Sequence, residues 1–265
     1  MTRRILHVSD LHFGRDRPEL LRPLIDAINE LAPDLVAVSG DFTQRARLGQ
    51  FRAARAFLDH LEPPWLAVPG NHDTPLDNLA VRLLSPWSRY RRYIASDLEP
   101  TWEDEEVVVA GVNTVNNWSW QRGRFSGHAV RRLCSLFETG DRRINVAVLH
   151  HPLEHGPEVE KRLMRGAGEA LDALGGCGAD IVLSGHLHSW HVRPFADAGG
   201  VLFVQAGTGL STRVRGEPND FNLLTVDGPR VVVEQWTAAD GEAEFVPTRA
   251  AAFRKSEDRW ERSGA

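Results

Sequence analysis

The stretch WLAVPGNHD, residues 65–73, joins a short apolar run to three consecutive polar side chains. An apolar run of this length that stops at a Pro-Gly pair is typical of a buried strand followed by a sharp turn. A simple turn would use the asparagine and the aspartate for local backbone hydrogen bonds and leave His72 as an ordinary exposed residue. The alternative is that Asn71, His72 and Asp73 each have a chemical role.

The same pattern recurs at four other apolar runs of the chain. Each of these runs ends at carboxylate or imidazole side chains: Asp10 and His12 after ILHVS, Asp41 after LVAVSG, His150 and His151 after NVAVL, and His186 and His188 after DIVLSG. In an open α/β sheet, functional groups collect outside the carboxyl ends of the strands. We therefore expect these side chains to meet at one edge of a sheet.

Imidazole and carboxylate groups suit divalent ions such as zinc, iron or manganese, and the absence of thiolates disfavours a closed structural zinc site. The set is too large for one ion and suits two, which together clamp the attacking and leaving oxygens of a phosphoryl group. Taken alone, Asp10-Leu11-His12 and Gly40-Asp41 are weak signals typical of turns, His150-His151 before Pro152 fits a loop, and Gly185-His186-Leu187-His188 is only suggestive. Their joint occurrence at strand ends favours the metal site.

Apolar runs alternate with amphipathic stretches and predict βαβ units, followed by antiparallel hairpins. The expected strands lie at residues 4–9, 34–40, 65–70, 106–112, 145–151 and 180–186, and then at 191–195, 201–207, 221–227 and 230–236. The expected helices lie at residues 18–32, 50–61, 127–138 and 165–174. We expect one domain over residues 1–248 and a loosely held polar tail over residues 249–265.

The chain has 265 residues, of which 42% are hydrophobic and 25% charged, so it is expected to form a globular core. Its net charge of −5 argues against bulk attraction to nucleic acid. Cys134 and Cys177 lie outside any CxxC spacing and are expected to be separate core residues in a reducing compartment. No apolar stretch reaches membrane-spanning length, and no signal peptide is recognised. These features predict a cytoplasmic protein without a membrane partner; a homo-oligomer stays open.

Taken together, the motifs resemble those of the calcineurin-like metallophosphoesterase superfamily, and the resemblance extends from Ile5 to about His191. The matching motifs are Asp10-Leu11-His12, Gly40-Asp41, Gly70-Asn71-His72-Asp73, His150 and Gly185-His186-Leu187-His188. The resemblance implies an α/β fold, namely a four-layer αββα sandwich of two mixed β-sheets flanked by helices. The chain length and the aspartate that ends the Gly70-Asn71-His72-Asp73 motif look most like those of the class III cyclic-nucleotide phosphodiesterases.

The resemblance also implies a role for each metal ligand. The first ion would be held by Asp10, His12 and His188. The second would be held by Asn71, His150 and His186. Asp41 would bridge the two ions, which would be Mn, Fe or Zn. His150 is preferred to His151 because the ligand of the family lies two residues before a proline, here Pro152.

The resemblance makes His72 the group that protonates the leaving oxygen or orients the phosphate. Asp73 would then hold the His72 ring in one tautomer and raise its pKa, so both residues are candidate catalytic groups. Asn71 and His72 are also expected to contact the substrate.

The implied activity is hydrolysis of a P–O ester bond in a small phosphodiester, with 3',5'-cyclic nucleotides as the substrate class of the nearest subfamily. The alternatives are other phosphodiesters (glycerophosphodiesters, lipid headgroups or nucleic acid) and a metal-binding scaffold without catalysis.

Some polar and aromatic residues lie outside these motifs. Arg213 and Arg215, in a glycine-containing stretch after an expected strand, would bind a substrate phosphate or stand exposed on a hairpin. Trp118 and Trp120 would stack on a base or, as we expect, pack in the core.

Overall fold

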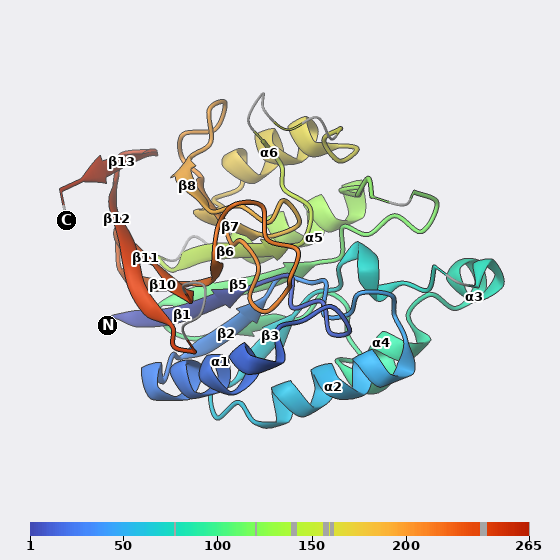
Figure 1. Ribbon diagram of the computed structural model, residues 1–265. Helices are drawn as coiled ribbons and strands as arrows, with labels where there is room; N and C mark the ends of the chain where they lie inside the picture. Colours follow the sequence, from blue (N-terminus) through green and yellow to red (C-terminus); the bar gives the residue numbers. More distant parts are fainter. Residues whose placement is uncertain are drawn as a thin grey trace.

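Two β-sheets face each other between two layers of helices in the computed structural model (Figure 1). The structure describes residues 1–76, 78–119, 121–138, 142–155, 159, 162–238 and 243–264. The expected α/β class and the four-layer αββα arrangement are confirmed, with α1 and α2 on one outer face and α5 and α6 on the other.

The first sheet has seven strands in the order β13-β12-β11-β10-β1-β2-β3. Its parallel half consists of β1 (Arg3–Val8), β2 (Leu35–Val38) and β3 (Trp65–Ala67). Its antiparallel half consists of β10 (Asn219–Asp227), β11 (Arg230–Ala238), β12 (Val246–Ser256) and β13 (Arg259–Ser263). The outer face is covered by α1 (Pro18–Leu31) and α2 (Leu48–Asp59).

The second sheet has six strands in the order β4-β5-β6-β7-β9-β8. Its members are β4 (Thr101–Glu103), β5 (Val107–Val112), β6 (Ile144–Leu149), β7 (Ile181–Ser184), β8 (His191–Pro194) and β9 (Leu202–Gln205). All neighbours are parallel except β4 with β5 and β8 with β9. The outer face is covered by α5 (Gly127–Phe137) and α6 (Ala167–Gly176).

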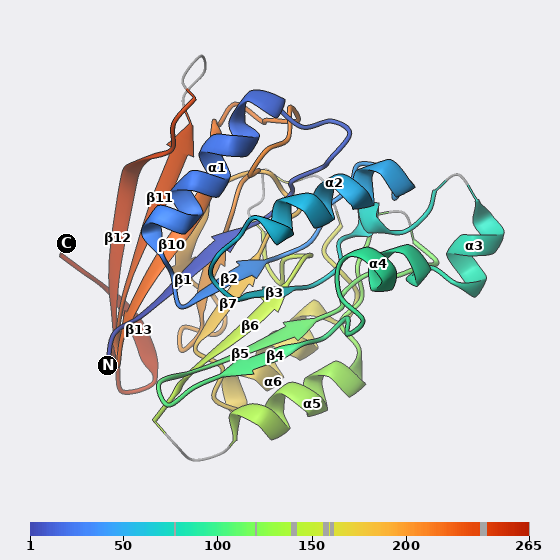
Figure 2. The ribbon, with the colours of Figure 1, turned by 90° about the horizontal axis from the view of Figure 1, so that it is seen from below.

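Apolar patterning explains this layering. In α1 the buried residues Leu20, Leu24, Ile25 and Ile28 recur three or four positions apart, so one stripe of the helix faces the first sheet. Strands β2, β5, β6 and β7 are buried along their whole length because each faces the other sheet on one side and helices on the other. The parallel strands of both sheets run in a common direction and end at one edge of the molecule. Figure 2 shows their arrows pointing toward this edge.

Three short helical segments connect β3 to β4. The 3₁₀ turn η1 (Asn71–Asp73) follows β3 directly. Two short helices, α3 (Leu79–Leu84) and α4 (Ser88–Tyr93), then lead to β4. No helix among the described residues is both long and apolar enough to cross a bilayer.

The expectation of a loose polar tail after residue 248 is wrong. Residues 249–263 lie mostly in β12 and β13, which complete the first sheet. Phe253 and Trp260 are buried in the core between the two sheets, and the indole Nε1 of Trp260 donates to the carbonyl of Asp180 at 3.0 Å. The charged residues that alternate with these apolar ones lie on exposed positions, which gives the segment its polar composition.

The expectation of two separate core thiols is also wrong, because Cys134 and Cys177 form a disulfide. Their Cα atoms lie 5.1 Å apart although the residues are 43 positions apart in sequence. Cys134 lies in α5 and Cys177 follows α6, and the packing of these two helices brings the sulfurs together. Such a pairing leaves no spacing signal in the sequence.

The tryptophan expectation fails for Trp118, whose side chain is 84% exposed rather than packed in the core. Trp120 lies outside the described residues.

The burial of Trp260 predicts that the C-terminal strands contribute to stability. Trp260→Ala removes a buried aromatic ring and its hydrogen bond to Asp180, so the free energy of unfolding should fall by about 3–5 kcal/mol in urea denaturation. The matched change Trp118→Ala affects an exposed ring and should alter the free energy of unfolding by less than about 0.5 kcal/mol. Equal small effects would show that β13 is not part of the folded core.

Candidate metal centre

Left-handed backbone conformations mark the strand ends where the predicted ligands lie. Five of the seven predicted ligands have positive φ angles: Asp10 (54°), His12 (48°), Asp41 (53°), His186 (72°) and His188 (59°). Such angles are uncommon for residues other than glycine and cluster at functional sites, where the surrounding structure enforces them. Their concentration in one place indicates that the fold holds these side chains in a geometry the local sequence does not favour.

Asp10, His12 and His188 form the first group. The Oδ1 atom of Asp10 lies 3.3 Å from Nε2 of His12 and 3.1 Å from Nε2 of His188, and the two Nε2 atoms are 3.3 Å apart. The Nδ1 of His188 donates to the carbonyl of Arg213 at 2.8 Å. That bond fixes the tautomer and turns Nε2 toward the group, which is how histidine ligands are commonly oriented. The three residues expected from the resemblance at one ion therefore lie together.

Asp41 lies between the first group and a second one. Its Oδ2 atom is 3.6 Å from Nε2 of His12 and 3.3 Å from Nε2 of His150. Its other oxygen, Oδ1, accepts a hydrogen bond of 2.8 Å from the backbone N–H of His72. One carboxylate oxygen thus faces both groups, as a bridging ligand must.

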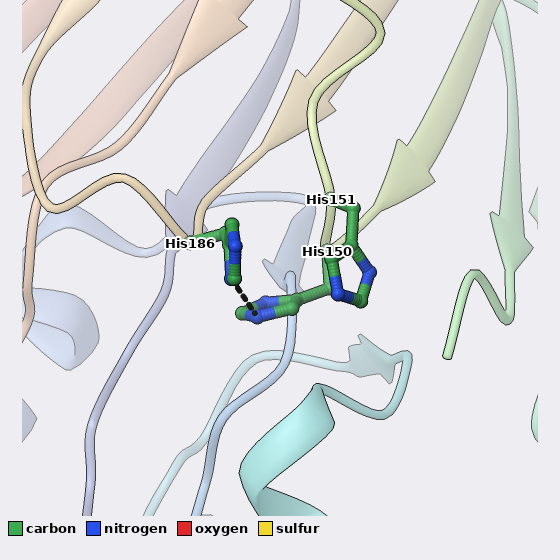
Figure 3. Close-up of side chains that lie close together, drawn as sticks. All are labelled: His150, His151 and His186. Atoms are coloured by element: carbon green, nitrogen blue, oxygen red, sulfur yellow. Dashed lines mark hydrogen bonds between the residues drawn. The ribbon is translucent and has the colours of Figure 1, made fainter. Parts of the chain in front are cut away.

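Asn71, His150 and His186 form the second group. Nε2 of His150 lies 3.2 Å from Oδ1 of Asn71 and 3.2 Å from Nδ1 of His186 (Figure 3). The Nδ1 of His150 donates to the carbonyl of Ser39 at 2.8 Å, so Nε2 is again the atom presented to the group.

His151 lies beside this second group. A ligand atom of His151 lies within 4.8 Å of those of His150 and His186, and the rings of His151 and His186 have centroids 4.7 Å apart. Its Nδ1 forms a hydrogen bond of 2.9 Å with the hydroxyl of Thr114. The choice of His150 over His151 as the ligand therefore stays a prediction.

The buried carboxylates and imidazoles of the site stabilise one another's charged forms. Burial would raise the pKa of Asp10 and of Asp41, but the surrounding histidines outweigh it and hold both pKa values well below the usual range. Burial would likewise lower the pKa of His150, but the Asp41 and Asp10 carboxylates raise it to about 9. Both carboxylates are therefore ionised at neutral pH.

Buried Oδ1 of Asp10 has no hydrogen-bond partner among the described residues, a costly arrangement unless something else compensates it. Oxygen and imidazole donors converging on such a point fit divalent transition ions. The described residues thus contain His/Asp clusters suited to hold metal.

His72 is oriented by a different partner from the one expected. Its Nδ1 donates to the carbonyl of Gln44 at 2.7 Å, and its Nε2 lies 3.2 Å from Nη1 of Arg213. Burial is the largest cause that lowers the pKa of His72, opposed in part by Asp41. The expectation that Asp73 fixes the His72 tautomer and raises the pKa of His72 is wrong.

Asp73 instead ties two strand-end loops together. One oxygen accepts from the backbone and the hydroxyl of Thr43, and the other accepts from the N–H groups of Phe42 and Gly70. Burial and the nearby Asp41 carboxylate raise the pKa of Asp73 to about 7. Both oxygens are used inside the loops, which gives Asp73 a structural role, and its predicted catalytic role stays a prediction.

The two predicted arginines differ in placement. The loop after β9 is fixed over the first group by backbone hydrogen bonds from Gly209 to Ser9 and from Thr212 to Arg15. Arg213 follows this anchored stretch and is half-buried beside His72. Arg215 is exposed and forms no hydrogen bond or ion pair with any residue the structure describes, so its predicted contact with substrate stays a prediction.

Sequence reasoning missed the groups that orient the imidazoles. The carbonyls of Ser39, Gln44 and Arg213 each accept from an Nδ1 atom, and the hydroxyl of Ser9 donates to Oδ2 of Asp10 at 2.6 Å. A backbone carbonyl is present at every position, so no residue type marks these roles in the sequence.

Facing mixed sheets with imidazole and carboxylate clusters at the ends of their parallel strands define a metallophosphoesterase fold. The family model described as calcineurin-like phosphoesterase matches residues 3–190, so the chain belongs to that family.

Curated relatives match only part of the chain. UDP-2,3-diacylglucosamine pyrophosphatase LpxG of Chlamydia muridarum is 34% identical over 26% of this chain and 22% of its own length. Glycerophosphodiester phosphodiesterase GpdQ of Enterobacter lignolyticus is 34% identical over 26% of this chain and 29% of its own. A probable cyclic nucleotide phosphodiesterase of Synechococcus is 29% identical over 28% of this chain and 33% of its own. The matched stretches thus span a third or less of these relatives.

Solved structures agree with the fold. Purple acid phosphatase PPD1 from yellow lupin superposes with a TM-score of 0.71 at 13% identity, over 94% of this chain and 53% of that chain. PhoD gives a TM-score of 0.71 at 11% identity, over 100% of this chain and 72% of that chain. At these identities the likeness supports the fold alone.

The close approach of Gly70 to Asp41 generates a prediction about metal binding. A Cβ atom on Gly70 would lie 2.1 Å from Oδ1 and 2.3 Å from the backbone nitrogen of Asp41, so Gly70→Ala must displace the carboxylate. We expect metal affinity, measured by titration of the metal-free protein, to fall by about 10–100-fold.

The matched control is Gly49→Ala, because no described heavy atom lies within 4 Å of its Cβ position. That variant should bind metal normally. Wild-type affinity in both variants would contradict the importance of the Asp41 position.

Proposed function

We propose that the chain is a phosphodiesterase that uses two divalent transition-metal ions to hydrolyse a P–O ester bond. The observation that carries this proposal is Oδ2 of Asp41, which faces His12 of one group and His150 of the other. A carboxylate shared in this way suits two ions about 3.5–4 Å apart, the separation used in two-metal phosphoryl chemistry.

The proposed ligands are those of the two groups. The first ion would be held by Asp10, His12 and His188. The second would be held by Asn71, His150 and His186. Asp41 would be shared between them. Mn, Fe and Zn all suit this donor set. When bound, such ions supply Lewis-acid activation of water and of the phosphoryl oxygens.

The protein's own contribution beyond the ligands is to bind and orient the phosphoryl group. The guanidinium of Arg213 would exchange its contact with His72 for a substrate oxygen, because its fork suits phosphate. His72 donates its Nδ1 proton in a hydrogen bond to the Gln44 carbonyl. Nε2 is therefore the ring nitrogen that faces the substrate position. Because the guanidinium of Arg213 is a donor, Nε2 accepts from it in this state, so both roles expected for His72, protonating the leaving oxygen and orienting the phosphate, would require a proton on Nε2. Asn71, a member of the second ligand group, would also contact the substrate.

The proposed substrate is a small phosphodiester. The motif resemblance favours 3',5'-cyclic nucleotides, and the names of the relatives add glycerophosphodiesters and a diacylated nucleotide sugar as classes to test. Nucleic acid is disfavoured by the net charge of −5. A metal-binding scaffold without catalysis is the competing function.

Location and assembly stay proposals as well. The sequence predicts a cytoplasmic protein, but the Cys134–Cys177 disulfide disfavours a strongly reducing compartment. A homo-oligomer also stays open.

The proposed activity is tested with metal-loaded protein on a substrate panel. Bis(p-nitrophenyl) phosphate, cyclic AMP, a glycerophosphodiester and single-stranded DNA are compared by release of the alcohol or the phosphomonoester product. We expect turnover of at least one small diester and loss of both metal and activity in Asp41→Asn, because the shared carboxylate is weakened. Full metal loading of the wild type without any turnover would favour the scaffold. Near-normal turnover of Asp41→Asn with full metal content would refute the bridge.

Arg213 gives a second prediction with a built-in control. Arg213→Ala keeps the backbone carbonyl that orients His188 but removes the guanidinium, so metal content should stay normal while kcat/KM falls by about 10–100-fold. Arg215→Ala, an exposed neighbour, should leave kcat/KM unchanged. An equal loss in both variants would mean that the loop contributes only general positive charge.

A further inference from the structure

Three large apolar side chains stand exposed on two neighbouring segments. Leu83 and Leu84 end helix α3 and are 43% and 85% exposed, and Trp118, in the loop after β5, is 84% exposed. Apolar side chains that gather at one place on a surface mark interaction sites more often than single exposed ones do.

The buried guanidinium of Arg82 joins the two segments. It donates to the carbonyls of Asn117 and Ser119, which flank Trp118, at 2.9 Å each. It also donates to the hydroxyl of Thr74 at 3.0 Å, and that hydroxyl donates to the carbonyl of Asn71. The segment that carries Trp118 is therefore tied to helix α3 and to the turn that carries a proposed metal ligand.

Both ribbon views place α3 outside the sandwich (Figures 1 and 2). It projects at the edge toward which β3 and β5 run, the same edge at which the histidine and aspartate groups lie. A flat partner that covered this projection would meet the edge of the molecule that carries the candidate metal centre.

The charge of these segments is opposite to that of the chain. Residues 78–96 and 113–126 contain six arginines and no aspartate or glutamate, whereas the whole chain carries a net charge of −5. Of these arginines, Arg91, Arg92 and Arg124 are exposed. Apolar anchors combined with a local cationic field complement a surface that is apolar inside and anionic outside.

We propose that the surface carried by these two segments, the α3 patch (the exposed side chains Leu83, Leu84, Trp118, Arg91, Arg92 and Arg124 of residues 78–96 and 113–126), docks on an anionic phospholipid surface. The tryptophan and leucines insert at the headgroup boundary, and the arginines contact lipid phosphates. A symmetric pair of chains joined through the same patch would bring two cationic patches together without any acidic residue of these segments to pair with them, so the charge favours lipid over a second copy. The docking proposal rests only on this patch. Docking would serve the proposed function because it would bring the edge that carries the candidate metal centre to diesters held in or near the bilayer.

The test measures sedimentation of the full chain with vesicles of phosphatidylcholine containing phosphatidylglycerol, compared with phosphatidylcholine alone. We expect binding to the anionic vesicles and a loss of at least tenfold in Leu84→Asp and Trp118→Asp. Val246→Asp, at an exposed apolar position on β12 away from the patch, should bind as the wild type does. Far-UV circular dichroism spectra and thermal unfolding midpoints should be equal in all four proteins, which shows without any turnover that the variants fold.

Failure of docking and failure of the proposed function are distinguishable, because vesicle binding is read without turnover. Absence of wild-type binding, or binding that neither patch variant weakens, would overturn the proposal. A wild-type dimer that Leu84→Asp dissociates, seen by analytical ultracentrifugation, would assign the patch to a second copy and would also overturn it.

Discussion

The carboxylate of Asp41 is the point on which the candidate centre depends. It is buried, and an ionised carboxylate away from water is costly unless charges and hydrogen-bond donors surround it. The imidazoles of His12 and His150 and the backbone N–H of His72 supply that surrounding. These three residues come from different strand ends, so the stability of this one charge requires both sheets to meet at a common edge.

Around this carboxylate the chain uses its backbone as much as its side chains. Carbonyls of Ser39, Gln44 and Arg213 hold three imidazoles by Nδ1, and Asp73 in turn holds the loops after β2 and β3. Left-handed backbone angles at five predicted ligands show that tertiary contacts, rather than local preference, set the direction of these side chains. The centre is thus held by the loops as one connected network.

The hydrophobic pattern of the sequence predicted the strands that are buried on both faces and the helix that is buried along one stripe. Fully apolar strands such as β2 and β6, and the regular stripe of α1, could be recognised because their periodicity differs from that of any loop. Strands β12 and β13 escaped recognition because their exposed faces carry charged residues that outnumber Phe253 and Trp260. The Cys134–Cys177 pair escaped because contact between α5 and α6 is not encoded in cysteine spacing.

The sequence by itself determined the family, the layered α/β class and the set of polar residues at strand ends, since these depend on residue type and periodicity. Tertiary structure alone decided how those residues are used. It placed Oδ2 of Asp41 between two imidazoles, assigned the His72 tautomer to Gln44 instead of Asp73, and brought the guanidinium of Arg213 to His72. The physical reason is that hydrogen bonds to backbone carbonyls and contacts between distant loops depend on distance in space, which no single stretch of the sequence specifies.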